Sequence, residues 1–278
     1  MAQNKKLIAI VAVIIIIVAA VGIYWYATKD NGDDPNKVTF LIEDNDGVYF
    51  WVSGSGEMTD DAFENAVSKS AVDLQSSESS YGISINGING LENESDWSYY
   101  WATYTYSDGE WKYADDGLSV MKSSDYDYIA LFYVANNYPS DPILPDNIPS
   151  VQDAKIWTKD TSGVLFTIES QSGMYLRING TGTTVYDALD DATSNYNIEF
   201  TGSEWTSYGK VIDTIFDLGM VSVDDVYTFW STKVLSDDGT AWETSEHVVG
   251  GLLSSENAQI CLIYSTGSET PIAPVYSA

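Results

Sequence analysis

The chain has 278 residues, enough for two modest domains rather than one large one once a membrane anchor is set aside. It holds 41 acidic and 12 basic residues; all the acids but only 10 of the bases follow the apolar segment near the N-terminus, so this larger part has a net charge of −31. Such a field repels phosphate backbones, which excludes nucleic acid as a partner, and it suits a solvated surface, a salty habitat, or a cationic or neutral ligand.

The N-terminal segment reads as a membrane anchor. Leu7 to Tyr26 form an uncharged run of 20 residues, which as a helix spans about 30 Å, the thickness of a bilayer core. Lys5 and Lys6 before the run and three aromatic residues at its end fit a positive-inside orientation with an interfacial aromatic belt. The alternative is a cleaved signal peptide, but the run is long for one and lacks a clear cleavage site. We expect a transmembrane signal anchor in residues 1–29, a polar stalk in 30–37, and the rest of the chain to be extracellular.

An internal repeat organises the remainder. Residues 38–66 match residues 164–192 at a constant offset of 126, and the identical pairs include Phe40/Phe166, Gly47/Gly173 and Gly54/Gly180. Later matches, such as Trp101 with Trp230, follow at a slightly larger offset, as loop insertions would produce. A period this long indicates a duplicated domain rather than a solenoid.

Each copy predicts the same elements. Val38, Phe40 and Ile42 recur at every second position and predict a strand, and Gly47 lies in a hairpin turn that leads to a return strand. A short helix is expected next, capped by Thr59 in the first copy and by Thr183 or Thr184 in the second. Further strands then end in residues 128–134 and 259–264.

These elements predict an α+β protein with two tandem β-grasp-like domains, each a mostly antiparallel sheet with one short helix. We place the domains at residues 38–135 and 164–265. A proline-rich linker occupies residues 136–163 between them, and a polar tail follows in residues 266–278. Cys261, the only cysteine, lies in an apolar run and is expected to be a buried small hydrophobe.

The pattern of hairpin, helix and aromatic cluster resembles a known family. The segments that carry the resemblance read SGSGEMTDDAF and DWSYYWATYTYSDGEW in the first copy, and NGTGTTVYDAL and YTFWSTKVLSDDGTAW in the second. They are similar to the transcobalamin C-terminal-like domain, also called the DUF4430 family. The resemblance implies a β-grasp-like fold on a secreted or surface protein and, from the vitamin carriers, contact with one face of cobalamin. The carriers' helical barrel partner domain is absent, so a corrinoid would have to be held between the copies or by one copy with a partner.

Aromatic residues are the candidate ligand contacts. Strand alternation divides the first cluster between two faces, and a domain of this size is not expected to bury both faces, so one set should be partly exposed. The predicted ligand-binding residues are Trp97, Tyr99, Tyr100, Tyr104, Trp111, Tyr227 and Phe229. The alternative is that these aromatics are ordinary sheet surface and core; Trp101 and Trp230, being repeated, are expected in the core.

Nothing in the sequence indicates a catalytic or metal centre. His247 is the only histidine, and no G-x-S-x-G elbow accompanies it. A lone histidine without a second cysteine does not build a zinc site, although it could ligate a corrinoid cobalt. We therefore expect no enzyme and no required cofactor. The leading hypothesis is an anchored extracellular protein that captures cobalamin or another corrinoid; the alternative is an adhesive or structural cell-envelope protein that binds protein or glycan.

Overall fold

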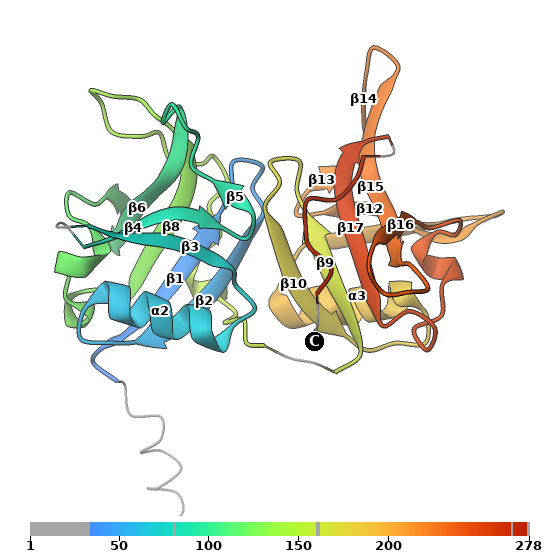
Figure 1. Cartoon of the computed structure of the whole chain (residues 1–278), viewed down its shortest axis with the longest axis horizontal. Helices are drawn as coiled ribbons and strands as arrows, with labels where there is room; N and C mark the ends of the chain where they lie inside the picture. Colours follow the sequence, from blue (N-terminus) through green and yellow to red (C-terminus); the bar gives the residue numbers. More distant parts are fainter. Residues whose placement is uncertain (1–33, 80–81, 160–161, 268, 277–278) are drawn as a thin grey trace, which may run out of the picture. The chain divides into compact units, whose positions relative to one another are not determined.

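The structure, a computed structural model, describes residues 34–79, 82–159, 162–267 and 269–276. The predicted anchor in residues 1–29 lies outside these ranges. Within them the chain is an α+β fold of several sheets with two α-helices, and Asn36–Ala278 form one compact unit (Figure 1). Among the described residues no helix is long and apolar enough to cross a membrane.

The first half builds a five-stranded sheet in the order β2-β1-β8-β6-β7. Its strands are β1 (Lys37–Glu43), β2 (Tyr49–Ser55), β6 (Tyr99–Ser107), β7 (Glu110–Tyr113) and β8 (Tyr128–Ala135). β1 is parallel to β8 and the other pairs are antiparallel. Between β2 and β6 the chain forms helix α2 (Thr59–Lys69) and a small sheet of β3 (Leu74–Ser79), β4 (Gly82–Ile88) and β5 (Leu91–Glu92). Two 3-10 turns, η1 (Leu118–Val120) and η2 (Ser123–Asp125), precede β8.

The second half repeats the first four strands of this arrangement in the order β10-β9-β17-β15, with β9 parallel to β17, and β15 pairs further with β14 and with β16. Its sheet contains β9 (Val164–Glu169), β10 (Tyr175–Gly180), β14 (Val221–Val223), β15 (Val226–Leu235) and β17 (Gln259–Thr266), with β16 (Trp242–Thr244) paired to β15. Helix α3 (Val185–Tyr196) follows β10, and the small sheet consists of β11 (Phe200–Trp205), β12 (Gly209–Ile215) and β13 (Leu218–Gly219). A 3-10 turn, η3 (Val151–Asp153), lies between the halves, and η4 (Val249–Gly251) precedes β17.

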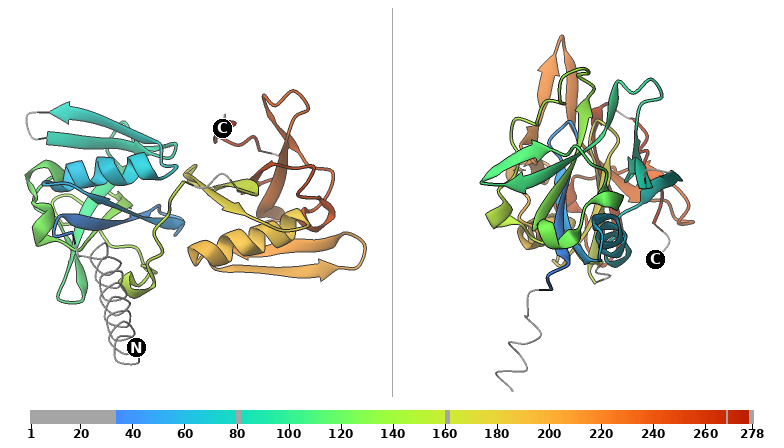
Figure 2. Two further views of the ribbon diagram at one scale, coloured as in Figure 1. Left: turned by 90° about the horizontal axis from the view of Figure 1, so that it is seen from below. Right: turned by 90° about the vertical axis from the view of Figure 1, so that its left-hand side faces the viewer.

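The predicted strand alternation is confirmed by what the first sheet buries. Val38, Phe40 and Ile42 are fully buried and share one apolar core with Phe63 of α2 and Ile88 of β4. The helix and the small sheet therefore cover the same face of the large sheet, as the ribbon also shows (Figure 2). Burial of these side chains is the main stabilising contribution to the fold.

The residue that caps the N-terminus of the helix differs between the halves. Thr59 is the first residue of α2 rather than its cap, so the capping role predicted for it is wrong; Met58 is the N-cap, and the Thr59 hydroxyl donates to the Leu118 carbonyl (2.7 Å). In the second half Thr184 caps α3 in a reciprocal capping box with Asp187.

The repeated glycines of the hairpin's return strand have a packing reason. A Cβ on Gly54 would collide with the Ala62 carbonyl oxygen of α2, and one on Gly180 would collide with the Ala188 carbonyl oxygen of α3. Each helix can lie this close to its strand only because glycine has no side chain.

The outer face of the first sheet is covered by the predicted linker. Leu144, Ile148 and Val151 pack on a second apolar cluster that includes Phe132, and the hydroxyl of Tyr104 donates to the Pro142 carbonyl (2.9 Å).

The predicted tail covers the outer face of the second sheet in the same way. The backbone amides of Ile272 and Ala273 donate to the Glu169 carboxylate (2.9 and 2.6 Å), and the Trp242 indole donates to the Ala273 carbonyl (3.1 Å). The covering segments share the pattern Pro-Ile-x-Pro, at residues 142–145 and 271–274, so the repeat extends beyond the last strand.

The two halves contact each other through equivalent turns. The Ser170 hydroxyl donates to the Asp44 carboxylate (2.5 Å), and these residues are 126 apart, the offset of the repeat. The hydroxyl of Ser172 donates to the same Asp44 oxygen (2.6 Å), and its backbone amide donates to Asp46 (2.6 Å). Two polar hairpin turns thus satisfy each other away from water.

Trp157, from the predicted linker, adds an apolar contact to this interface. Its ring stacks on Phe50 of the first half (5.1 Å between centroids) and meets Tyr196 of the second half edge-on (4.9 Å).

Candidate ligand-binding site

The predicted aromatic contacts of the first half are divided between the two faces of the sheet. Trp97 and Tyr99 are exposed (54% and 38%), whereas Tyr104 is only 1% exposed and Trp111 packs beside it on the cluster under the linker. The ring of Tyr100 lies 6.4 Å from that of Trp97. The expectation that one set of aromatics is partly exposed is met by Trp97 and Tyr99, whereas residues 142–154 cover the face of the sheet that holds Tyr104.

The two repeated tryptophans occupy the core, as predicted. The Trp101 indole donates to the Leu91 carbonyl (2.9 Å), and the Trp230 indole donates to the Leu218 carbonyl (2.7 Å). The Tyr133 hydroxyl donates to the carbonyl of Glu92, the residue after Leu91 (2.8 Å). In the second half the Tyr264 hydroxyl donates to the carbonyl of Gly219, the residue after Leu218 (2.6 Å). These shared bonds align β5 with β13 residue by residue. Cys261 is also buried, as expected.

A pocket of about 710 Å³ opens in the second half, between its small sheet and strand β15. It is lined by Trp205, Tyr208, Val211, Ile212, Asp213, Thr214, Gly219, Met220, Phe229, Trp230, Ser231, Thr232 and residues 244–249. Of the predicted contacts, Phe229 lines this pocket; Tyr227 lies two residues earlier on the same strand and is exposed. The size and the mainly apolar lining are typical of small-molecule sites.

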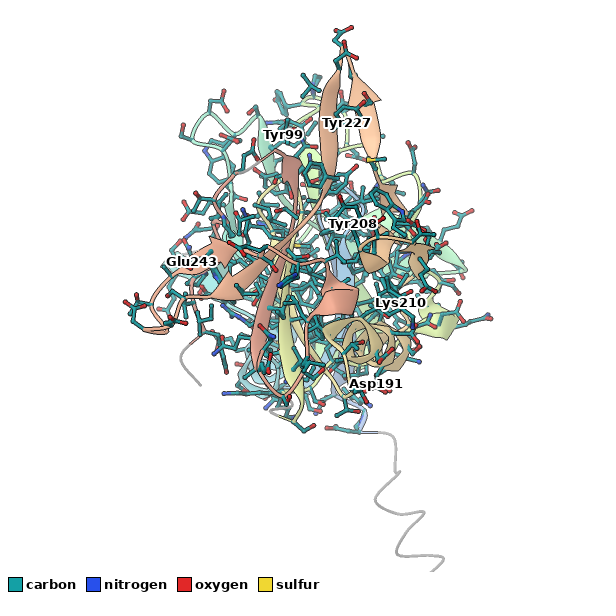
Figure 3. All side chains as sticks on the ribbon, turned by 90° about the vertical axis from the view of Figure 1, so that its right-hand side faces the viewer. Tyr99, Asp191, Tyr208, Lys210, Tyr227 and Glu243 are labelled. Carbon is teal, nitrogen blue, oxygen red and sulfur yellow. The ribbon has the colours of Figure 1, made fainter. Side chains whose placement is uncertain are left out.

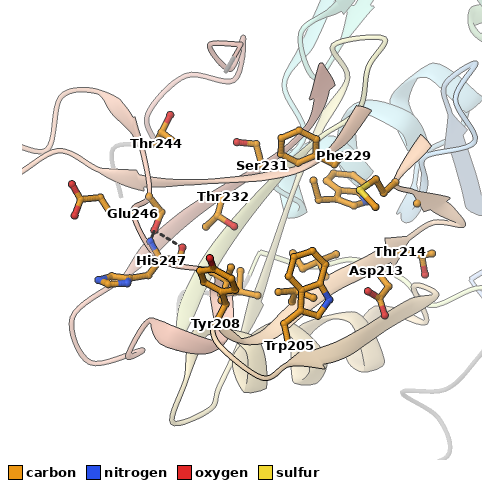
Figure 4. A pocket seen from close by; sticks show the side chains of 18 residues that line it. Trp205, Tyr208, Asp213, Thr214, Phe229, Ser231, Thr232, Thr244, Glu246 and His247 are labelled. Atoms are coloured by element: carbon orange, nitrogen blue, oxygen red, sulfur yellow. Dashed lines mark hydrogen bonds between the residues drawn. The ribbon is translucent and has the colours of Figure 1, made fainter. Parts of the chain in front are cut away.

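Local structure presents two aromatic rings along one wall of the pocket. Trp205 ends β11 and Tyr208 precedes β12, and the Tyr208 amide donates to the Trp205 carbonyl (3.0 Å) across a tight turn. Both rings are largely exposed, at 52% and 66%. Figure 4 shows them along one side of the pocket and Phe229 on the facing strand; Tyr208 also lies at the surface in Figure 3.

One position at the opening of the pocket differs between the halves in its hydrogen bonding. In the first half Asn93 ties the two sheets together: its amide group donates to the Ile85 carbonyl of β4 (2.8 Å), and its side-chain oxygen accepts from the Trp101 amide of β6 (2.9 Å). The equivalent residue is Met220, directly after β13, and it lines the pocket with 63% of its surface exposed. A methionine thioether cannot form this double bridge.

A second bond of the first half is also missing from its counterpart. The Ile83 amide of β4 donates to the Ser119 hydroxyl of η1 (2.7 Å). In the second half Gly250 of η4 takes the place of Ser119 and has no side chain to offer. Two replacements of hydrogen-bonding side chains thus accompany the open pocket.

The Ser245 hydroxyl at the pocket is hydrogen-bonded to backbone atoms. The Ser245 hydroxyl donates to the backbone carbonyl of His247 (2.7 Å) and accepts from its backbone amide (3.1 Å), so it is engaged by main chain rather than by the imidazole (Figure 4). His247 and Glu246 are exposed at the rim. Among the residues that the structure describes, no group of three or more metal-binding side chains is found.

Sequence reasoning missed Trp205, Tyr208 and Met220. A signal for two of them exists in the repeat itself: Trp205 stands where the first copy has Ser79, and Met220 where it has Asn93. Apolar residues that appear in only one copy of a duplicated domain mark the surface on which the copies differ. Comparison with models of known protein families and with curated proteins finds no match for this chain.

Proposed function

We propose that this chain is a membrane-anchored extracellular binding protein that captures a small molecule in the pocket of its second half and performs no chemistry on it. The observation that carries the proposal is the pocket of about 710 Å³ walled by Trp205, Tyr208 and Phe229. Aromatic rings provide a large apolar contact area with little loss of side-chain entropy on binding.

A corrinoid is the ligand class that the family resemblance suggests. When the small sheets and β14 are set aside, the strand order in each half becomes second, first, fifth, third, with the fourth strand (β7 or β16) paired to the third and the helix after the second strand. That is the order expected of a β-grasp, and it supports two tandem β-grasp-like domains of the transcobalamin C-terminal-like type. Trp205 and Tyr208 are exposed at the mouth, so a macrocycle larger than the pocket can insert one edge and remain partly in solvent.

Titration of the full-length chain in lipid nanodiscs with cyanocobalamin tests the proposal. Binding is followed by equilibrium dialysis and by the visible spectrum of the corrin. Trp205→Leu is expected to weaken binding about tenfold, the effect of removing one aromatic hot-spot contact. Trp97→Leu is the matched control, since Trp97 has nearly the same exposure (54% against 52%) but lies in the first half. Equal loss in both variants, or loss only with Trp97→Leu, argues against the pocket as the site.

One observation favours the alternative of an adhesive or structural envelope protein. The hairpin of β14 and β15 exposes Val221 and Val223 on the last strand of the sheet and Val226 and Tyr227 on the strand next to it, each at least half exposed. Apolar side chains on an edge strand suit contact with another protein. Absence of corrinoid binding together with concentration-dependent self-association of the full chain would favour this second function.

A further inference from the structure

The charges that line the pocket are of one sign. Asp213 and Glu246 lie among its 18 lining residues, which include no lysine and no arginine. In Figure 4 the two carboxylates lie at opposite ends of the aromatic wall formed by Trp205 and Tyr208. The Ser203 hydroxyl donates to Asp213 (2.8 Å), which restrains the orientation of that carboxylate.

The basic side chain nearest along the same strand is engaged elsewhere. Lys210 immediately precedes Val211, a lining residue of β12, yet its ammonium group lies 3.3 Å from the Asp187 carboxylate and 4.5 Å from the centre of the Tyr186 ring. Neither Asp187 nor Tyr186 lines the pocket. The charged side chains that line the pocket are therefore both acidic, within a chain whose net charge is −29.

We propose that the pocket selects an organic cation with a flat apolar body. This inference rests on the proposed binding function and specifies its ligand by charge. A delocalised or quaternary cation is attracted by the faces of tryptophan and tyrosine, which also accept its apolar body. The two carboxylates add a Coulombic attraction that is strongest at low ionic strength, and the same field repels an anion of the same shape.

The preference can be tested inside and outside the corrinoid class. Aquacobalamin carries one positive charge at neutral pH and cyanocobalamin none, so the cation is expected to bind more tightly. For a ligand without a metal, N-methylquinolinium, neutral quinoline and the 2-naphthoate anion offer one ring size with three charges. For the full chain in nanodiscs of uncharged lipid, we expect N-methylquinolinium to bind about tenfold more tightly than quinoline, 2-naphthoate to bind most weakly, and the preference to shrink as salt is added.

A charge-neutralising pair of substitutions assigns the effect to the pocket. Asp213→Asn with Glu246→Gln is expected to remove the preference for N-methylquinolinium over quinoline. Glu78→Gln with Asp115→Asn is the control, since it removes the same two charges from exposed positions in the first half and should leave the preference intact. Retention of the preference in the pocket variant, or its loss in the control, overturns the inference.

The outcomes separate this inference from the function on which it rests. Equal binding of the three bicyclic probes, or preference for 2-naphthoate, overturns the charge selection but leaves a binding pocket. Binding of cyanocobalamin as tight as that of aquacobalamin does the same for corrinoids. If no bicyclic probe and no corrinoid binds, the proposed function itself fails.

Discussion

Asn93 and Met220 occupy the same position in the two halves of the chain, and only Asn93 ties the small sheet to the large one. The bonds of Trp101 and Trp230 to equivalent carbonyls fix this correspondence. One half thus has a polar bridge where the other has an apolar side chain at the mouth of a pocket. Duplication makes this possible, because one copy can preserve the packed form while the other changes.

Met220→Asn is expected to restore the bridge in the second half and to narrow the pocket. The new amide would reach the Ile212 carbonyl and the Trp230 amide as Asn93 reaches their counterparts, which favours a stability equal to or above that of the parent. Affinity for N-methylquinolinium should fall about tenfold because the open space is lost. Equilibrium dialysis and a urea unfolding curve measure the two effects.

Met220→Leu is the control for that substitution, because it keeps an apolar side chain without adding a bridging amide. It should leave both affinity and stability close to the parent values. Weaker binding by Met220→Leu than by Met220→Asn would contradict the account of the bridge.

Protonation of Glu43 is expected to make stability fall as pH rises. This carboxyl is 1% exposed, one of its oxygens has no hydrogen-bond partner, and burial, followed by the charge of Asp44, raises its pKa from 4.5 to about 8. The folded state therefore holds the proton that the unfolded state releases. The stabilisation is complete below about pH 4.5 and is lost as pH rises through about 8, with a slope of up to about 1.4 kcal/mol per pH unit.

Unfolding in urea at several pH values checks this effect. Burial also raises the pKa of Asp44, to about 6, so the slope from Glu43 is expected to continue up to about pH 8, after Asp44 has ionised. Glu43→Gln should flatten the curve between these two pKa values, whereas Glu243→Gln, at an exposed position (Figure 3), should not. An unchanged slope in Glu43→Gln would show that another group carries it.

Removal of the two serine hydroxyls at the contact between the halves is expected to destabilise the fold in a pH-dependent way. Ser170→Ala with Ser172→Ala takes two donors from the Asp44 carboxylate and should cost about 1–3 kcal/mol above pH 6, where Asp44 is ionised. The loss should shrink at lower pH, because a protonated Asp44 needs fewer donors. Ser124→Ala, an exposed hydroxyl, is the control. A pH-independent loss would point to packing alone.

Trp157 is expected to hold the two halves through its ring rather than its indole nitrogen. The ring contacts Phe50 and Tyr196, while the buried nitrogen has no hydrogen-bond partner. Trp157→Ala should therefore cost about 3–5 kcal/mol, and Trp157→Phe much less, since it removes the unpaired donor and keeps a ring. Thermal unfolding compares the two; similar losses would mean that the nitrogen contributes as much as the ring.

The repeat, the order of its strands and helices and the burial of Cys261 could be read from the sequence. Each depends on local pattern: alternation at Val38, Phe40 and Ile42 sets a strand, and Gly47 and Gly173 set matching turns with positive φ. Strand alternation also assigned the aromatic residues in 99–106 correctly to the two faces of the first sheet, because successive side chains of a strand point to opposite faces.

Which face is covered and which half is open was decided only by tertiary structure. Tyr104 is buried because Pro142, 38 residues later, returns across its face, and Glu169 is met by backbone amides more than 100 residues away. The pocket likewise requires β12 and β15 to stand apart where β4 and β6 are bridged by Asn93. Local pattern specifies which way a side chain points, but only contacts between distant segments determine whether water or protein meets it.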